Sequence, residues 1–300
     1  MTPNPIAGMQ PRGVTLLVTV LLLVLLITVV AELAMLTSVD SIRVWGRANT
    51  LRHRLAVDSV LQLVRARLAS GDHRLQDDLD RLGRVTLETT LGRCRVRCAV
   101  GDDAAKLDVA AFDQRSQRRL LTRKLTALAR VYDLPRARVK LRPLGVTPED
   151  DQRRYRWFDQ LFADPPPAAF LRVASDGDGI LASAPVWSDV LTLFGSGRID
   201  VRRVAPEVLE VALADIERGL AQSILSARHQ AEPSQNFLPE AVARLDASVR
   251  HRVAERLAFD LHRYALTIET AIGGDRRCWY VVATMDGDTI ETHYRGQIQW

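Results

Sequence analysis

The sequence predicts an α+β fold in which a long N-terminal transmembrane helix precedes an antiparallel sheet, and a helical inserted domain interrupts that sheet. Three observations predict it. An unbroken apolar run occupies residues 14–31. Segments with strand-like alternation occur within residues 85–100 and again within residues 264–300, and helical periodicity lies between them. Strands at both ends of the chain around a helical middle indicate one sheet that an insertion divides.

The composition is that of a folded protein, and it excludes several classes. The chain has 300 residues, of which 47% are hydrophobic and 26% are charged. These values argue against wholesale disorder, collagen-like repeats and a polytopic membrane protein. The length predicts one large domain or two modest ones. Three cysteines are too few for a disulfide scaffold.

The net charge is +5, from 41 lysines and arginines against 36 aspartates and glutamates, and nearly all of the cations are arginine. A basic surface binds nucleic acid or anionic lipid when its charges are gathered in one patch. Here acids interrupt the arginines, as in residues 77–81 (DDLDR). We therefore interpret the charge as solvated or paired surface.

The apolar run, VTLLVTVLLLVLLITVVA, contains no charge, glycine or proline. As a helix, residues 14–31 cover about 27 Å, close to the hydrocarbon thickness of a bilayer. A cleaved secretory signal has a shorter apolar region and a small-residue exit. This run instead ends at Glu32, so a single-pass anchor fits better.

The residues just before the run carry a family resemblance. A short polar leader, residues 1–13, ends in Arg12-Gly13 and is followed at once by Val14. This order resembles the class III leader of type IV pilins and pseudopilins. The resemblance implies that a prepilin peptidase cuts between Gly13 and Val14 and methylates the new N-terminus. The alternative is an ordinary anchor with a flanking Arg and Gly.

The fifth mature position would be Val18, where most members of the family carry Glu. The missing Glu resembles the K-type minor pseudopilin of type II secretion, which sits at the tip of the pseudopilus. A tip subunit has no subunit above it to pair with a carboxylate, so the cost of burying that charge in the membrane has no offset. The alternative is that Val18 is one apolar residue of an ordinary anchor.

The elements after the membrane follow in order. Helical periodicity continues to a stop near residues 70–72, which predicts one long N-terminal helix. A hairpin follows, with strands at residues 85–91 and 94–100. Cys94 and Cys98 face the same side of the second strand, about 13 Å apart, which is too far for a disulfide, so we interpret both as core residues.

The middle of the chain contains a helix at residues 120–131 and then a short motif. The motif resembles the K-type element G-x-I-N-V-N-T-A-P-x-E-V-L, and it contains Gly197, Ile199, Asp200, Val201, Pro206 and Glu207. A similar element earlier in the chain contains Asp108. Asp108 and Asp200 stand where the K-type family has Asn. Asp can accept hydrogen bonds from nearby amides as Asn does, although it cannot donate them. Pro206-Glu207 predicts the start of a helix.

Residues 199–228 faintly resemble a helix-hairpin-helix, a motif that presents backbone amides to DNA phosphate. The glycines of that hairpin are absent, and Asp215 in the turn would repel phosphate. We therefore expect a packing role and no nucleic-acid partner.

No metal or active site is predicted. Residues 175–180 (SDGDGI) could wrap calcium, but the twelfth position of an EF-hand loop counted from Asp176 is Trp187, which cannot ligate. The acidic stretch typical of the K-type family is also missing, so calcium is only weakly supported and no cofactor is expected. No phosphate-binding loop, nucleophile elbow or zinc motif occurs, so we expect no enzymatic activity. An anchored hydrolase is the weakest alternative.

The C-terminal turns at residues 273–275 and 286–288 predict a three-stranded antiparallel meander. The resemblance implies a pilin-like sheet interrupted by a helical inserted domain. Its parts are a leader (1–13), a transmembrane helix (14–31), a helix continuation with the first hairpin (32–110), a mostly helical insertion (111–260) and C-terminal strands (261–300).

The resemblance further implies a minor pseudopilin that initiates or caps a periplasmic pseudopilus for protein export. Its partners would be other minor and major pseudopilins, prepilin peptidase, inner-membrane lipid and, at the tip, the secretin or exported cargo. It would lie in the bacterial inner membrane as a single-pass protein with a cytoplasmic N-terminus and a periplasmic head. In that oxidising compartment, Cys278 could pair with Cys94 or Cys98. The alternative is a singly anchored periplasmic binding or sensor domain unrelated to pili.

Overall fold

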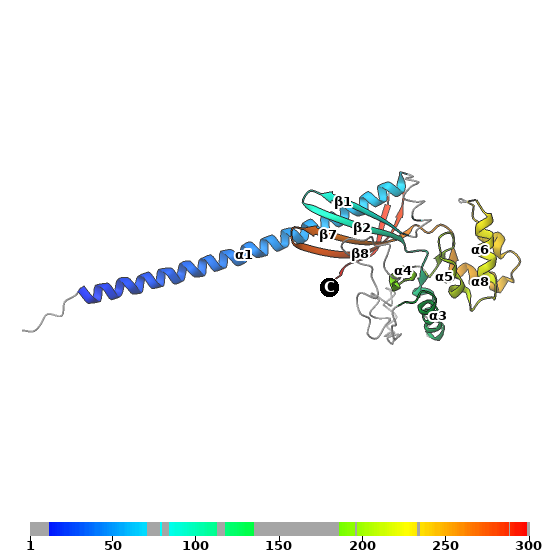
Figure 1. The fold of residues 1–300 in the computed structure, drawn as a ribbon, viewed down its shortest axis with the longest axis horizontal. Coiled ribbons are helices and arrows are strands. Elements are labelled where there is room, and N and C mark those ends of the chain that lie inside the picture. Colours follow the sequence, from blue (N-terminus) through cyan, green and yellow to red (C-terminus); the bar gives the residue numbers. More distant parts are fainter. Residues whose placement is uncertain are drawn as a thin grey trace, which may run out of the picture. The chain divides into compact units, whose positions relative to one another are not determined.

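The computed structural model describes residues 12–70, 79, 84–112, 118–134, 186–195, 197–232, 235–287 and 289–298. The chain divides into two units, Met1–Arg54 and Leu55–Trp300. The fold is α+β, with a long apolar N-terminal helix and an antiparallel sheet (Figure 1).

Helix α1 runs from Arg12 to Ala69, and its residues up to Arg54 belong to the first unit. Its last turn ends at Ser70, whose backbone N–H donates to Ala66 O at 2.9 Å and whose hydroxyl donates to Arg67 O at 3.0 Å. The Ser hydroxyl thereby satisfies one of the carbonyls that a helix end leaves open. The predicted stop near residue 70 is confirmed.

One antiparallel sheet dominates the second unit, in the order β1-β2-β7-β8-β9. Strand β2 pairs with β7, so the early hairpin and the late meander form the same sheet, as predicted. Gly92 (φ 61°) and Gly273 (φ 59°) occupy the left-handed region in two of its turns, where glycine is strain-free. The strands are β1 (Arg84–Leu91), β2 (Cys94–Asp102), β7 (Arg263–Ile272), β8 (Asp275–Asp286) and β9 (Thr289–Ile298).

The chain between β2 and β7 is mostly helical where the structure describes it. Two short parallel pairings accompany the helices: β3 (Leu107–Asp108) with β4 (Leu191–Thr192), and β5 (Ile199–Asp200) with β6 (Leu257–Ala258). The helices are η1 (Val109–Phe112), α3 (Arg118–Val131), α4 (Trp187–Val190), α5 (Pro206–Leu213), α6 (Leu220–Gln230), α7 (Leu238–Val242) and α8 (Ala247–Arg256). The predicted helix at residues 120–131 and the predicted helix start at Pro206 are both confirmed.

The sheet has a hydrophobic core on each face, because successive strand residues point to opposite sides. One face packs against the C-terminal part of α1, whose buried residues there are Ala56, Val57, Val60, Leu61 and Val64. The other face packs against the inserted helices, with Tyr280 and Val282 from β8 in that core. The sheet is therefore the central layer of the second unit.

This alternation corrects one expectation from the sequence. Cys94 and Cys98 lie in the core that faces α1, whereas Cys278 lies in the core that faces the insertion. The sheet separates them, and all three are buried free thiols. Pairing of Cys278 with either strand cysteine is therefore wrong for this fold.

Candidate functional site

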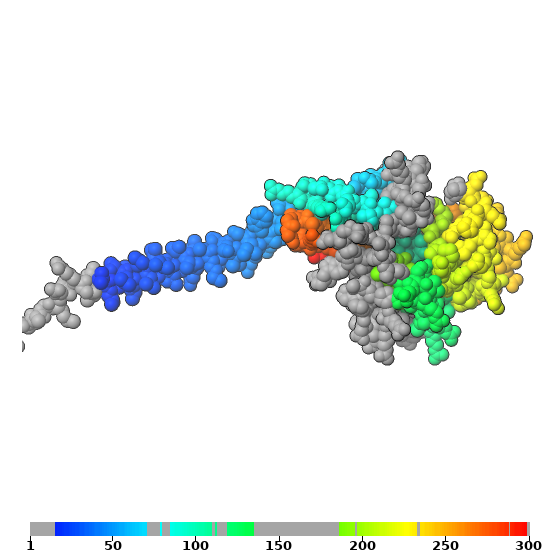
Figure 2. All heavy atoms as spheres, in the orientation of Figure 1, coloured from blue at the N-terminus to red at the C-terminus, as the bar shows by residue number. Residues whose placement is uncertain are grey.

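Among the described residues, α1 is the helix that is long and apolar enough to cross a membrane, with a mean hydropathy of 2.9 over an 18-residue window. Its side chains from Leu16 to Arg47 are exposed (Figure 2). The hydroxyls of Thr19 and Thr28 donate to Leu16 O and Val24 O, at 2.8 Å and 2.6 Å. These bonds satisfy the two polar groups within the helix itself, as a lipid environment requires.

The predicted processing residues lie at the start of α1. Gly13 and Val14 are in the helix, which begins at Arg12, while the leader residues 1–11 lie outside the described residues. Val18, at the position where the resemblance predicts a missing Glu, is 48% exposed. Cleavage between Gly13 and Val14 stays a prediction.

Exposed apolar side chains continue on α1 well past the predicted membrane run. They are Leu33, Met35, Leu36, Val39, Ile42, Val44, Trp45 and Leu51. At about 100° per residue, Leu33 and Leu51 face one side of the helix, whereas Met35 and Ile42 face the opposite side. Leu36 and Trp45 lie between, on opposite flanks. A helix with apolar residues on every side is stable only when other chains or lipid surround it.

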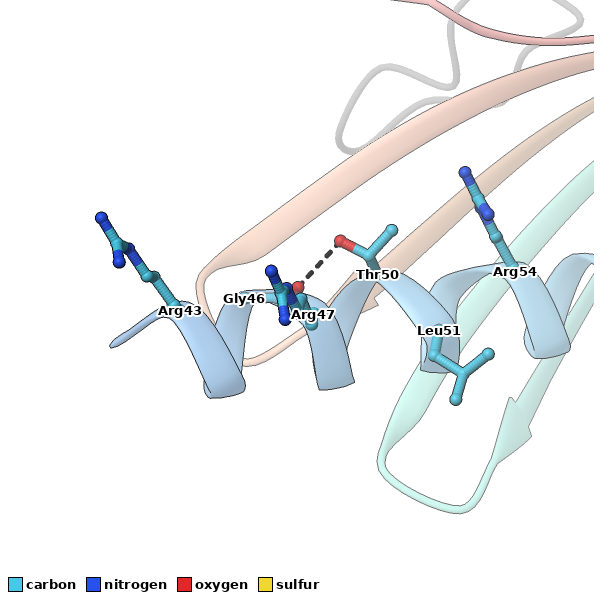
Figure 3. A pocket seen from close by; sticks show the side chains of 6 residues that line it. All are labelled: Arg43, Gly46, Arg47, Thr50, Leu51 and Arg54. Carbon is cyan, nitrogen blue, oxygen red and sulfur yellow. Dashed lines mark hydrogen bonds between the residues drawn. The ribbon is translucent and has the colours of Figure 1, made fainter. Parts of the chain in front are cut away.

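A shallow hollow on the same segment is lined by Arg43, Gly46, Arg47, Thr50, Leu51 and Arg54 (Figure 3). The Thr50 hydroxyl donates to Gly46 O at 2.8 Å, so this polar group is already satisfied within the helix. Sequence reasoning missed this feature because it judged arginine to be dispersed among acids. The signal was present, since residues 41–54 contain four arginines and no acid.

The motif residues lie around two buried aspartates. The Asp108 carboxylate accepts a hydrogen bond from Gly197 N at 2.7 Å, and Gly197 has a left-handed φ of 87° that favours glycine. The Asp200 carboxylate accepts from Arg202 N at 2.9 Å and Leu261 N at 2.9 Å. Both aspartates thus accept hydrogen bonds from backbone amides, Asp108 from one that is 89 residues away in the sequence.

The remaining motif residues build the surroundings of these aspartates. Ile199 and Val201 are buried in the core of the insertion. Pro206 is in the first turn of α5, and Glu207 in the same turn accepts a hydrogen bond from the Tyr132 hydroxyl at 3.2 Å. The motif thus joins the end of β5 to α5, which is a structural arrangement.

Two further buried aspartates, which the sequence did not single out, connect the sheet with the insertion. Asp103 accepts from Arg263 Nε at 3.0 Å, from Lys106 Nζ at 3.2 Å and from the Thr192 hydroxyl at 2.7 Å. Asp102 pairs with Arg203 at 3.3 Å. These residues come from the ends of β2 and β7 and from the insertion, so their ion pairs fix how the two parts meet.

The electrostatics of Asp102 and Asp103 differ because their partners differ. Burial raises the pKa of Asp102 to about 6, an effect that the Arg203 guanidinium opposes and the nearby Asp200 carboxylate reinforces. We name this set the acidic junction: Asp102, Asp103, Asp108 and Asp200, with the cations Lys106, Arg203 and Arg263.

Cations from α3 and α8 contact the turn between α5 and α6. Lys124 Nζ donates to Ala212 O at 2.9 Å and pairs with Asp215 at 2.6 Å. Arg256 also pairs with Asp215, at 2.6 Å, and donates to Ala212 O at 3.1 Å. Cations at a helix C-terminus neutralise its exposed carbonyls, so the turn has a packing role.

Two of the buried cysteines have thiols of low reactivity. Burial raises the pKa of the Cys98 and Cys278 thiols, which makes them poor nucleophiles. Within the described ranges, no group of three or more His, Cys, Asp or Glu side chains could hold a metal ion. The candidate calcium turn, residues 175–180, lies outside the described residues.

No protein-family model and no curated protein sequence matches the chain. Among solved structures, it is similar to one chain of the GspK–GspI–GspJ complex of the type 2 secretion system of enterotoxigenic Escherichia coli. The identity is 15% and the TM-score is 0.39, and the match covers 82% of this chain and 100% of the other. A similarity at this level assigns no family.

Proposed function

We propose that this chain is a minor pseudopilin of a type II secretion-like system, anchored in the bacterial inner membrane with its head in the periplasm. Its function would be assembly: α1 joins the helices of other pseudopilins, and the head initiates or caps a short pseudopilus for protein export. The proposal assigns no catalytic residue and no cofactor to the chain.

The observation that carries this proposal is the apolar surface of α1 beyond the membrane-length run. Residues 33–51 expose apolar side chains on all sides of the helix. A solitary anchor would leave that surface in water, where each exposed Leu or Met forgoes about 1.5–3 kcal/mol of burial. A bundle of neighbouring helices would cover it, as the pseudopilin resemblance of the leader implies.

The leader provides the direct test. The full-length chain is co-expressed with a prepilin peptidase, and the N-terminus of the product is sequenced. We expect a product that begins at Val14. Gly13→Leu should abolish cleavage because its side chain obstructs the scissile bond, whereas the matched leader variant Gly8→Leu should still be cut.

The outcomes separate the proposal from its alternative. An intact Met1, or a cut beyond Ala31, would contradict the pseudopilin proposal. An intact and membrane-bound chain would instead favour a singly anchored periplasmic binding or sensor domain.

A further inference from the structure

Residues 41–54 of α1 form the most one-sided charged segment of the helix. They contain Arg43, Arg47, Arg52 and Arg54, and no aspartate or glutamate. The whole chain has a net charge of +5. Four of the 41 lysines and arginines of the chain therefore lie within fourteen residues of one helix that contain no acid.

Three of these arginines share a face of the helix. Arg47 and Arg54 lie four and eleven residues after Arg43, so all three fall within about 40° of one another around the axis. Figure 3 shows Arg43 and Arg54 projecting from the same side of the helix, and Leu51 from the other. Arg52, nine residues from Arg43, lies about half a turn out of phase. We call Arg43, Arg47 and Arg54 the arginine stripe.

The acid nearest to Arg43 does little to neutralise that arginine. Asp40 lies 3.8 Å from Arg43, and both side chains are at least 70% exposed. An exposed pair at that distance contributes little. Arg43 and Arg47 thus present a positive field to a neighbouring chain.

The length of the arginine stripe along the helix axis distinguishes a lipid layer from a second helix as its partner. Lipid headgroups form a layer only about 5–8 Å thick on each side of the hydrocarbon core. Along a continuous helix, Arg43 lies about 18 Å beyond Ala31 and Arg54 about 35 Å beyond it. One layer of headgroups cannot reach all three arginines, whereas a second helix parallel to α1 can.

The hollow between the arginines suits such a helix. An added Cβ at Gly46 would meet no atom within 4 Å, so a neighbouring backbone can approach closely there. Gly46 lies between Arg43 and Arg47 in sequence and lines the same hollow. Carboxylates one helical turn apart on the partner would then lie opposite the guanidinium groups, a pairing that Arg favours.

We infer that the arginine stripe docks a parallel helix of a neighbouring membrane-anchored subunit that carries Asp or Glu side chains at one-turn spacing. This inference rests on the proposed function, in which α1 packs among other pseudopilin helices, and it specifies the chemistry of the helix that α1 contacts there.

The test places a photo-crosslinking amino acid at Gly46 of the full-length chain in its native membranes and maps the adduct by mass spectrometry. The expected adduct lies on an anchored helix with acids one turn apart. Arg47→Glu should lower its yield at least fivefold, and exchanging the mapped acid for Arg should restore it. Arg52→Glu, the matched exposed control on the opposite side, should leave the yield within twofold.

An adduct on lipid, an adduct on a helix without acids, no adduct, or an equal loss with Arg52→Glu would each overturn the inference. The two proposals fail separately. An acidic helix from a protein that prepilin peptidase does not process would keep the stripe's role but contradict the pseudopilin assignment. An adduct on a processed pseudopilin helix without acids would support the pseudopilin assignment but contradict the role of the arginine stripe.

Discussion

Neighbouring aspartates in the acidic junction experience different electrostatic environments. Asp103 accepts hydrogen bonds from two cations and a hydroxyl, which together hold a carboxylate in a buried site. Asp102 has one cation, Arg203, and otherwise accepts from the backbone of Ala104 and Ala105. Burial therefore dominates for Asp102 and raises its pKa to about 6, so this carboxyl titrates near neutral pH.

Asp102→Asn tests this assignment through the pH dependence of unfolding. The pKa of Asp102 is about 6 in the folded protein, against an ordinary value of 3.8 for the unfolded chain. Between these values the folded state binds more protons, so this group lowers the free energy of unfolding as pH rises. Relative to the wild type, Asn should become more stabilising by about 2 kcal/mol from pH 4 to pH 7.

Denaturant titrations of both proteins at pH 3, 4, 5, 6 and 7 measure the difference. At pH 3 and below, Asp102 is mostly protonated in both the folded and the unfolded protein, so the difference in stability measured there serves as the reference. If the free energy of unfolding of the wild type instead rises relative to that of the variant above pH 6, the Arg203 ion pair outweighs burial and the assignment is wrong.

Gly195→Ala probes the close approach of the backbone to the acidic junction. An added Cβ at Gly195 would overlap Asp108 Oδ2 and would lie 2.8 Å from Arg263 Nη2. The carboxylate would have to move and lose its bond to Gly197 N. We expect a destabilisation of about 2–4 kcal/mol, measured by chemical denaturation. Gly274→Ala, where the new methyl meets nothing within 4 Å, should change stability by less than about 1 kcal/mol.

The C-terminal end of helix α5 depends on an acid for its connection to α3 and α8. Burial alone would raise the pKa of Asp215, but hydrogen bonds from Arg256 and Lys124 lower it to about 2. Its contribution to stability is therefore present above the unfolded value of 3.8 and is lost as pH falls through about 2. Because Asp215 is partly exposed, screening limits this contribution to about 1 kcal/mol.

Asp215→Asn should remove that contribution and leave the cation of Lys124, which is 3% exposed, without its carboxylate. We expect a loss of about 2 kcal/mol in the free energy of unfolding at pH 7 that shrinks toward pH 2. Asp286→Asn, at an exposed turn residue, is the matched control. A loss of equal size at pH 2 and pH 7 would show that charge is not the cause.

Local patterns predicted the elements and the shared sheet, whereas the hydrogen bonds and ion pairs between side chains far apart in the sequence were not predictable. Alternation in β2 and the turn at Gly92 specify a hairpin, and the structure confirms it. The acidic junction joins Asp103 to Arg263, 160 residues away, and no periodicity relates the two. The net charge of the whole chain also concealed the arginine stripe, because a local excess of arginine over fourteen residues hardly changes an average over 300 residues. Local interactions set helix and strand, while tertiary packing selects which charges meet.

The division of the chain into two units separates anchoring from folding. Both hydrophobic cores are built from residues at or beyond Ala56, and the exposed apolar residues of α1 before Leu55 contribute to neither. The last turns of α1 therefore have a different role from its first ones. They cover one face of the five-stranded sheet and bury its apolar side chains there.

Two truncations test this separation. A fragment of residues 49–300 retains the five α1 residues of the core, so we expect it to be soluble without detergent and to unfold in one cooperative transition. A fragment of residues 71–300 lacks Ala56, Val57, Val60, Leu61 and Val64, all of them at most 5% exposed. Losing their burial removes on the order of 5–10 kcal/mol, comparable to the whole stability of a domain. The fragment of residues 71–300 should therefore aggregate or bind a hydrophobic dye. If both fragments instead unfold with equal cooperativity, α1 is not part of the folded head.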